Sequence, residues 1–167
     1  MLAIGAFVLG LATIAGAWGF QLIGGYIPCQ LCYAQRIPYY VGLPIAAIAV
    51  YAVLTGRITL SRLALVAVGG VFIWSAYEGG FHAGVEWGWW EGPASCAGGG
   101  GGEINREAGN LMNQLNQGKT VVSCSEASWR FPNADWGLSF AGWNAVISVM
   151  IASAAFVAAA LPRRASA

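Results

Sequence analysis

Long apolar stretches alternate with short polar segments along most of this sequence. Four of the stretches carry almost no charged side chain, and they cover residues 1–25, 37–54, 58–77 and 137–161. A helix that crosses the hydrocarbon core of a bilayer needs about 20 predominantly apolar residues. The pattern therefore predicts an all-α membrane protein, a bundle of four transmembrane helices in one integral membrane domain over residues 1–167.

The composition agrees with this interpretation. Hydrophobic residues make up 57% of the chain and charged residues only 9%, and the mean hydropathy is +0.61. Soluble proteins usually contain about 25% charged residues. The net charge of +1 lacks the cationic surplus that attracts nucleic acid. We therefore expect this chain to reside in a lipid bilayer. We do not expect it to bind nucleic acid.

The first apolar stretch could instead be a secretory signal peptide. Such a peptide has a basic segment ahead of an apolar run of about 7–15 residues. Residues 1–25 contain no Lys or Arg, and their apolar run is longer than that. We therefore interpret them as the first transmembrane helix.

The basic residues predict the orientation of the bundle. Arg57 and Arg62 lie at the connection between the second and third helices, and Arg163 and Arg164 follow the fourth. Cytoplasmic loops carry an excess of Lys and Arg, so both places should be cytoplasmic. With four spans, both termini are then cytoplasmic as well.

The opposite face carries two segments, about 26–36 and 79–136, and with them all four cysteines: Cys29, Cys32, Cys96 and Cys124. In a bacterium the outer face of the inner membrane is oxidising, so disulfides persist there. We expect this location, with the cysteines in the periplasm.

The segment 79–136 is too long for a simple connection between helices. It contains a tryptophan cluster at 87–90, which is typical of membrane interfaces, and a glycine run at 98–102, which is typical of flexible linkers. Apolar residues then recur at helical spacing over 103–117. We expect a short amphipathic helix there that lies in the interface plane.

Four cysteines allow three pairings, and proximity in the sequence favours 29 with 32 and 96 with 124. A disulfide between Cys96 and Cys124 would close a loop of about 29 residues and stabilise it by about 3–4 kcal/mol. Such a bond can be a simple structural staple. The glycine run inside the loop favours a mobile segment instead.

The stretch "PCQLCYAQR" has the features of a reactive thiol site. Pro28 suits the first turn of a helix, and Cys29, Cys32 and Arg36 would then share one helical stripe. The helix N-terminus and the guanidinium both favour thiolate over thiol. Arg36 could also be only a snorkelling anchor.

Four thiolates could bind zinc, but zinc ribbons usually have two Cys-x-x-Cys knuckles. Haem attachment fails because Tyr33 follows Cys32 where a histidine is required.

The order of these features resembles that of the DsbB family of bacterial disulfide bond formation proteins. "CQLCYAQR", "FHAGVEWGWWEGPASC" and "CSEASWRFPNADWGLSFAGWN" carry the resemblance, which covers essentially the whole chain. Ala34 and Gln35 depart from the family pattern, in which aromatic and acidic residues precede the arginine.

The resemblance implies a thiol:quinone oxidoreductase that reoxidises a DsbA-like periplasmic thiol oxidase. This relay is an established system that keeps the periplasm oxidising. By analogy, a thiolate of the partner attacks Cys96, and Cys29 with Cys32 reoxidises the Cys96–Cys124 pair. All four cysteines are then catalytic.

The resemblance also implies a site for a membrane quinone, ubiquinone or menaquinone. Cys32 would face the quinone ring, and Arg36 would stabilise its thiolate and polarise a quinone oxygen. His82, just past the third helix, would supply protons near this site. A lone histidine is often structural, and Glu78 is a weaker candidate for the same task. We expect no metal site; the alternative is a four-helix scaffold or a zinc-binding membrane protein with structural cysteines.

Overall fold

The computed structural model describes residues 1–93, 120–133 and 136–161. The elements within these ranges are α1 (Leu2–Leu22), β1 (Tyr26–Ile27), α2 (Gln30–Ala34), α3 (Ile37–Leu54), α4 (Ile58–Glu86), β2 (Thr120–Val121), β3 (Arg130–Phe131), β4 (Leu138–Ser139) and α6 (Phe140–Ala160).

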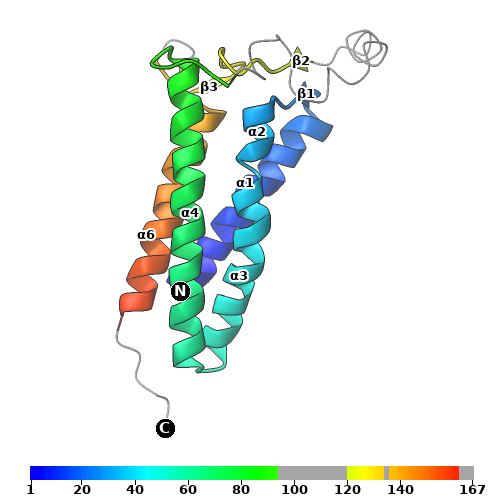
Figure 1. Cartoon of the computed structure of the whole chain (residues 1–167). Helices are drawn as coiled ribbons and strands as arrows, with labels where there is room; N and C mark the ends of the chain where they lie inside the picture. The colour runs from blue at the N-terminus through cyan, green and yellow to red at the C-terminus, as the bar shows by residue number, and fades with distance from the viewer. Residues whose placement is uncertain (94–119, 134–135, 162–167) are drawn as a thin grey trace.

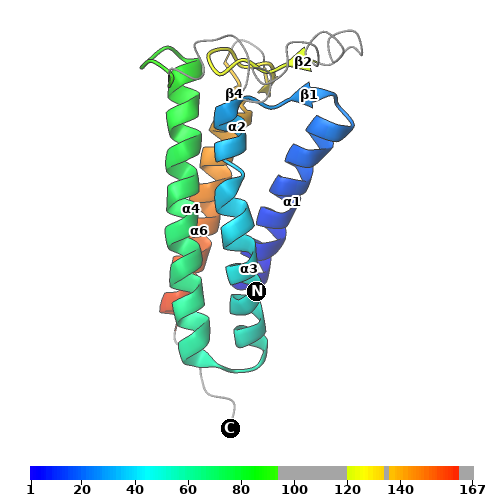
Figure 2. The same ribbon diagram turned by 45° about the vertical axis from the view of Figure 1, so that its right-hand side comes forward.

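The long helices form one elongated bundle (Figure 1). Among the described residues, four helical segments are long and apolar enough to cross a membrane: α1, α2 with α3, α4 and α6. The connection between α3 and α4 and the end of α6 lie at one end of the bundle, and the short strands lie at the other (Figures 1 and 2). The predicted class, an all-α bundle of four membrane-spanning helices, is confirmed.

The core of the bundle lies where α4 packs against α6 and α3. Phe72 on α4 contacts the ring of Tyr39 on α3 edge to face, with 5.2 Å between the ring centroids. Gly42 lets the two helices approach this closely, because a Cβ there would lie 2.8 Å from the Phe72 ring. Small residues at helix contacts are typical of membrane bundles, in which dispersion contacts drive the association of helices.

The third transmembrane helix is longer than the prediction. The predicted third helix covers residues 58–77 and ends before the charged Glu78. In the structure α4 continues to Glu86. Gly79 lies against α6, where a Cβ would be 2.8 Å from the backbone nitrogen of Ala145. The glycine therefore permits close helix packing and does not end the helix, so His82 lies inside α4.

The helix after Pro28 also differs from the prediction. Cys29 is the N-cap of α2, and Pro28 precedes it. The chain then turns at residues 35–36 before α3 begins. Pro38 lies at the start of α3, where its missing N–H interrupts the helical hydrogen bonds to the preceding turn. Cys29 and Arg36 therefore do not share one uninterrupted helical stripe, as the spacing suggests.

Two small strand pairs close the end of the bundle that carries the cysteines (Figure 2). Strands β1 and β2 pair in parallel, with Tyr26 opposite Thr120 and Ile27 opposite Val121. Strands β3 and β4 pair antiparallel. The predicted interfacial helix over 103–117 and the glycine run lie outside the described residues.

Candidate functional site

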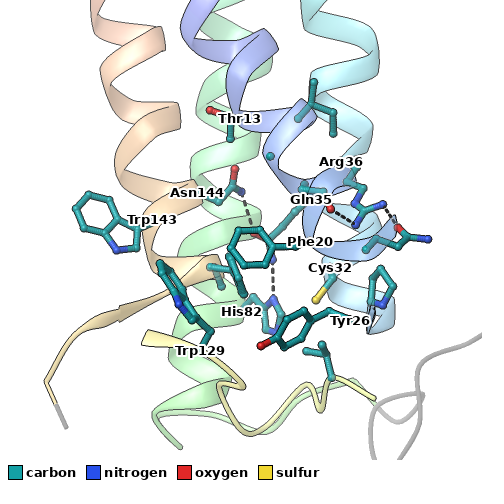
Figure 3. Close-up of a pocket in the computed structure, with 18 of the residues that line it drawn as sticks. Thr13, Phe20, Tyr26, Cys32, Gln35, Arg36, His82, Trp129, Trp143 and Asn144 are labelled. Atoms are coloured by element: carbon teal, nitrogen blue, oxygen red, sulfur yellow. Dashed lines mark hydrogen bonds between the residues drawn. The ribbon is translucent and has the colours of Figure 1, made fainter. Parts of the chain in front are cut away.

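A cavity of about 500 Å³ opens at the end of the bundle beside the short strands (Figure 3). One part of its wall is polar, with side chains from the start of the second span and from α4: Cys32, Gln35, Arg36, His82 and Glu86. The rest of the wall is mainly apolar and aromatic, and includes Phe20, Tyr26, Trp129, Phe140 and Trp143. Because helices and loops distant in sequence supply these groups, the fold assembles the cavity.

The two cysteines of the Cys-x-x-Cys motif are both free thiols. Cys32 lines the cavity, whereas Cys29 lies behind it and is 0% exposed. As N-cap of α2, the Cys29 sulfur accepts a hydrogen bond from the Cys32 backbone N–H, with 3.1 Å between sulfur and nitrogen. The helix start thus stabilises negative charge on Cys29 rather than on Cys32.

The pKa of Cys29 is lowered from 9.0 to about 5. The largest cause is a hydrogen bond from the Cys32 side chain. His82 contributes a second hydrogen bond and an electrostatic attraction, and the Cys32 backbone N–H contributes a third hydrogen bond. Together these outweigh burial, which raises the pKa. Cys29 is therefore a thiolate at neutral pH when the pair is reduced.

His82 lies between the cysteines and two polar side chains. Its Nε2 is 3.8 Å from the Cys29 sulfur and 3.9 Å from Oε1 of Glu86. Its Nδ1 is 2.6 Å from Nε2 of Gln35. The histidine is 2% exposed, and Figure 3 shows its ring beside Cys32 at the polar wall. His82 therefore lies beside the Cys29–Cys32 pair in the structure.

Arg36 joins the second span to the first. Its guanidinium donates hydrogen bonds to Oε1 of Gln21, at 2.5 Å, and to the carbonyl oxygen of Ala17, at 3.4 Å. It also lies over the rings of Trp18 and Tyr33. Arg36 is only 7% exposed. This burial does not fit a snorkelling anchor, and the arginine lines the same cavity as Cys32.

Cys124 is disulfide-bonded and buried. It belongs to a small apolar cluster with Cys29, Leu31 and Val85, against which Cys32 also packs. The structure therefore brings three of the four predicted catalytic cysteines to one place. Cys96 lies outside the described residues.

Three polar residues of the site did not emerge from the sequence. Glu86 is one helical turn beyond His82, its side chain is 5% exposed, and it accepts a hydrogen bond from the Ser139 hydroxyl. Gln35 and Asn144 form a hydrogen bond to each other beside His82. Glu86 follows His82 by four residues, and this spacing would place the two side chains next to each other if the helix were known to continue to Glu86.

The family comparison agrees with this geometry. The family model described as disulfide bond formation protein DsbB matches residues 1–158. The chain belongs to the DsbB family. No curated protein and no solved structure matches it.

Membership of the DsbB family gives the chain its general activity, which is disulfide bond formation by a membrane oxidoreductase. With four apolar helices, this DsbB-family protein is a multi-pass membrane protein. The polar wall of the cavity contains Cys32, Arg36 and His82, the residues to which the family resemblance assigns a common quinone site.

Proposed function

We propose that this protein is a thiol:quinone oxidoreductase that reoxidises a periplasmic DsbA-like dithiol protein. In this proposal it lies in the bacterial inner membrane with both termini in the cytoplasm. The observation that carries the proposal is the joint position of Cys32, Arg36 and His82 on one wall of an otherwise apolar cavity. A dithiol, a fixed cation and a proton-carrying group are what a two-electron, two-proton acceptor requires.

The shape of the cavity fits a lipid-soluble ring with an apolar tail. Its lining along α1 runs from Gln21 to Ala12, which corresponds to about 14 Å of helix. Opposite this, α6 contributes residues from Phe140 to Ile147. The charged and ionisable groups come from the start of the second span and from α4, while most of the lining along α1 and α6 is apolar. Ubiquinone and menaquinone both match this division.

The residues of the chain divide the chemistry among them. Oxidation of the Cys29–Cys32 dithiol to a disulfide releases two electrons and two protons, and the quinone accepts both. Arg36 presents positive charge at the cavity wall, where a quinone oxygen gains negative charge. His82 and Glu86 carry exchangeable protons on the same wall. Cys32 is the cysteine of this pair that borders the cavity, so it is placed to pass electrons out of the thiols.

The second cysteine pair connects the site with the soluble partner. Thiol–disulfide exchange requires a thiolate to reach a disulfide sulfur. Cys124 lies in the same apolar cluster as Cys29, which supports exchange between these two positions. In the proposed relay the partner's thiolate attacks Cys96 and releases the Cys124 thiolate, which attacks Cys29 and releases the Cys32 thiolate. The partner's second thiolate then displaces Cys96, so the partner leaves as a disulfide. Cys96 attacks Cys124, which reforms the Cys96–Cys124 disulfide and releases Cys29, so that Cys29 and Cys32 are left as a dithiol.

The test is a coupled assay with the purified full-length chain, a reduced DsbA-like protein and ubiquinone. We expect one quinone reduced for each dithiol oxidised, followed by quinone absorbance and thiol titration. Cys32→Ser should abolish the reaction, and Ser61→Ala, at the opposite end of α4, should leave it unchanged. Absence of quinone reduction by the unmodified protein, or full activity in Cys32→Ser, would refute the proposal.

A zinc site is the second candidate, because the ligand atoms of Cys29, Cys32 and His82 all lie within 4.8 Å of one another. A histidine that binds zinc through Nε2 usually donates its Nδ1–H to an acceptor. Here Gln35 directs its amino group at Nδ1, which disfavours metal binding. Stoichiometric zinc in the purified protein by elemental analysis, with unreactive thiols, would support this alternative.

A further inference from the structure

We infer that Gln35, held in place by Asn144 and Tyr39, fixes His82 as the neutral tautomer with its proton on Nε2. Gln35 is then a positioning residue that aims the N–H of the histidine at Cys29 and Glu86. The use of this N–H in catalysis rests on the proposed function, whereas the tautomer itself does not.

A continuous chain of buried hydrogen bonds leads to His82. The Tyr39 hydroxyl donates to Oδ1 of Asn144 at 2.7 Å, and Nδ2 of Asn144 donates to Oε1 of Gln35 at 2.8 Å. Nε2 of Gln35 then lies 2.6 Å from Nδ1 of His82. Figure 3 shows the last two of these interactions in line. All four side chains are buried.

The direction of donation decides where the imidazole proton lies. The nitrogen of a side-chain amide has two hydrogens and accepts none, so Nδ1 of His82 must accept. A neutral imidazole with an accepting Nδ1 carries its proton on Nε2. Each amide has its oxygen satisfied by the preceding donor in the chain. The orientation of Gln35 follows from Asn144, whose amino group donates to the amide oxygen of Gln35.

The surroundings of Nε2 favour the same assignment independently. This nitrogen faces the Cys29 sulfur at 3.8 Å and a carboxyl oxygen of Glu86 at 3.9 Å. The opposite tautomer would place a nitrogen lone pair against a thiolate, which is an acceptor only. A doubly protonated ring would place an N–H of His82 against the amino group of Gln35. Only the Nε2–H form gives every atom a compatible partner.

The consequence concerns how His82 handles protons. The amide of Gln35 has no proton to pass on, so a proton cannot enter the ring at Nδ1 and leave at Nε2. Nε2 therefore both loses and regains the proton, and Glu86 is the nearest carboxyl group to it. His82 stabilises the Cys29 thiolate as a neutral donor and exchanges protons through one nitrogen.

The test is ¹⁵N NMR of the full-length protein in detergent micelles, with the Cys29–Cys32 pair reduced. His82 is the only histidine in the chain, so its ring signals need no assignment by mutation. The couplings of the two nitrogens to the ring carbon-bound protons distinguish Nδ1 from Nε2. We expect a protonated Nε2 and an unprotonated Nδ1 at neutral pH. A protonated Nδ1, alone or together with Nε2, would overturn the inference.

Variants test whether Gln35 is the cause. In Gln35→Glu a carboxylate replaces the donor, and Nδ1 should become protonated. Asn144→Asp removes the donor to Gln35, and the Nε2–H population should fall, which provides a second route if the first variant fails to fold. Gln21→Glu, a matched change on another wall of the cavity, should leave the tautomer unaltered. An unchanged tautomer in both Gln35→Glu and Asn144→Asp would contradict the role of Gln35.

The tautomer and the activity can fail separately. If the NMR signals match and the coupled assay shows no quinone reduction, the proposed function is wrong and the tautomer assignment stands. If the enzyme is active but Nδ1 is protonated, only the inference about Gln35 is wrong.

Discussion

The acidity of Cys29 can be tested most directly, because it follows from hydrogen bonds with Cys32 and His82 and from the electrostatic attraction of His82 around one sulfur. A pKa of about 5 in place of 9.0 changes the thiolate-to-thiol ratio at pH 7 from about 1:100 to about 100:1. A lowered thiol pKa means that the thiolate persists above pH 5 and is lost as the pH falls through that value. We therefore expect nearly complete ionisation of Cys29 throughout the neutral range.

Removal of each donor should raise the pKa by an amount that reflects its contribution. The Cys32 side chain contributes most, so Cys32→Ala should move the titration of Cys29 furthest toward 9.0. His82→Ala should move it in the same direction by less. Cys32→Ser, which retains a hydroxyl donor, should fall between the parent protein and Cys32→Ala.

The measurement is the ultraviolet absorbance of the thiolate as a function of pH. A Cys96→Ser/Cys124→Ser background limits the signal to the Cys29–Cys32 pair, and subtraction of the Cys29→Ser spectrum isolates Cys29. Absorbance suits this site because the sulfur is 0% exposed and reagents reach it slowly. An inflection near pH 9 in the parent, or an unchanged inflection in Cys32→Ala, would refute the reasoning.

Three further predictions concern packing and the cavity. Gly79→Ala should destabilise the bundle by about 1–3 kcal/mol in thermal unfolding, because its Cβ would meet the backbone of α6. Gly80→Ala is the control and should not destabilise the bundle, since a Cβ at Gly80 meets open space. Equal effects of the two substitutions would contradict the close helix contact. Arg36→Ala should raise the KM for quinone about tenfold and leave exchange between the cysteine pairs intact, since it removes a charge-assisted hydrogen-bonding group; an unchanged KM and kcat would exclude the role. Glu86→Gln should lower kcat on the order of 100-fold with little change in KM, and an unaltered pH–rate profile would show that Glu86 supplies no proton.

The membrane architecture could be predicted because long uncharged runs have few alternatives in a bilayer. The helices α3 and α4 begin where the apolar stretches begin, at Ile37 and Ile58. The end of α4 could not be predicted, since a glycine pair beside a charged residue has the same appearance in a loop and in a tight helix contact. Only the position of α6 shows which of the two applies at Gly79.

Part of the site was predictable for a different reason. Cys29, Cys32 and Arg36 are close in sequence, and any helical arrangement keeps them together. Gln35 and Asn144 are separated by 109 positions, and their contact depends on how the second span and α6 face each other. Apolar periodicity does not specify that rotation, because in a membrane bundle both the lipid side and the core side are apolar.

The parallel pairing of β1 and β2 also affects which reductants can reach the sulfurs of Cys29 and Cys124. It holds the segment that leads to Cys124 across the segment that leads to Cys29, with Val122 donating its N–H to the carbonyl oxygen of Ile27. Both sulfurs are consequently shielded from water, with exposures of 5% and 0%. A small soluble reductant such as glutathione therefore meets neither sulfur at the surface. In the proposed relay, the two short strands therefore keep soluble thiols away from Cys29 and Cys124. Such thiols then cannot pass electrons to the quinone pool by reducing these two cysteines directly.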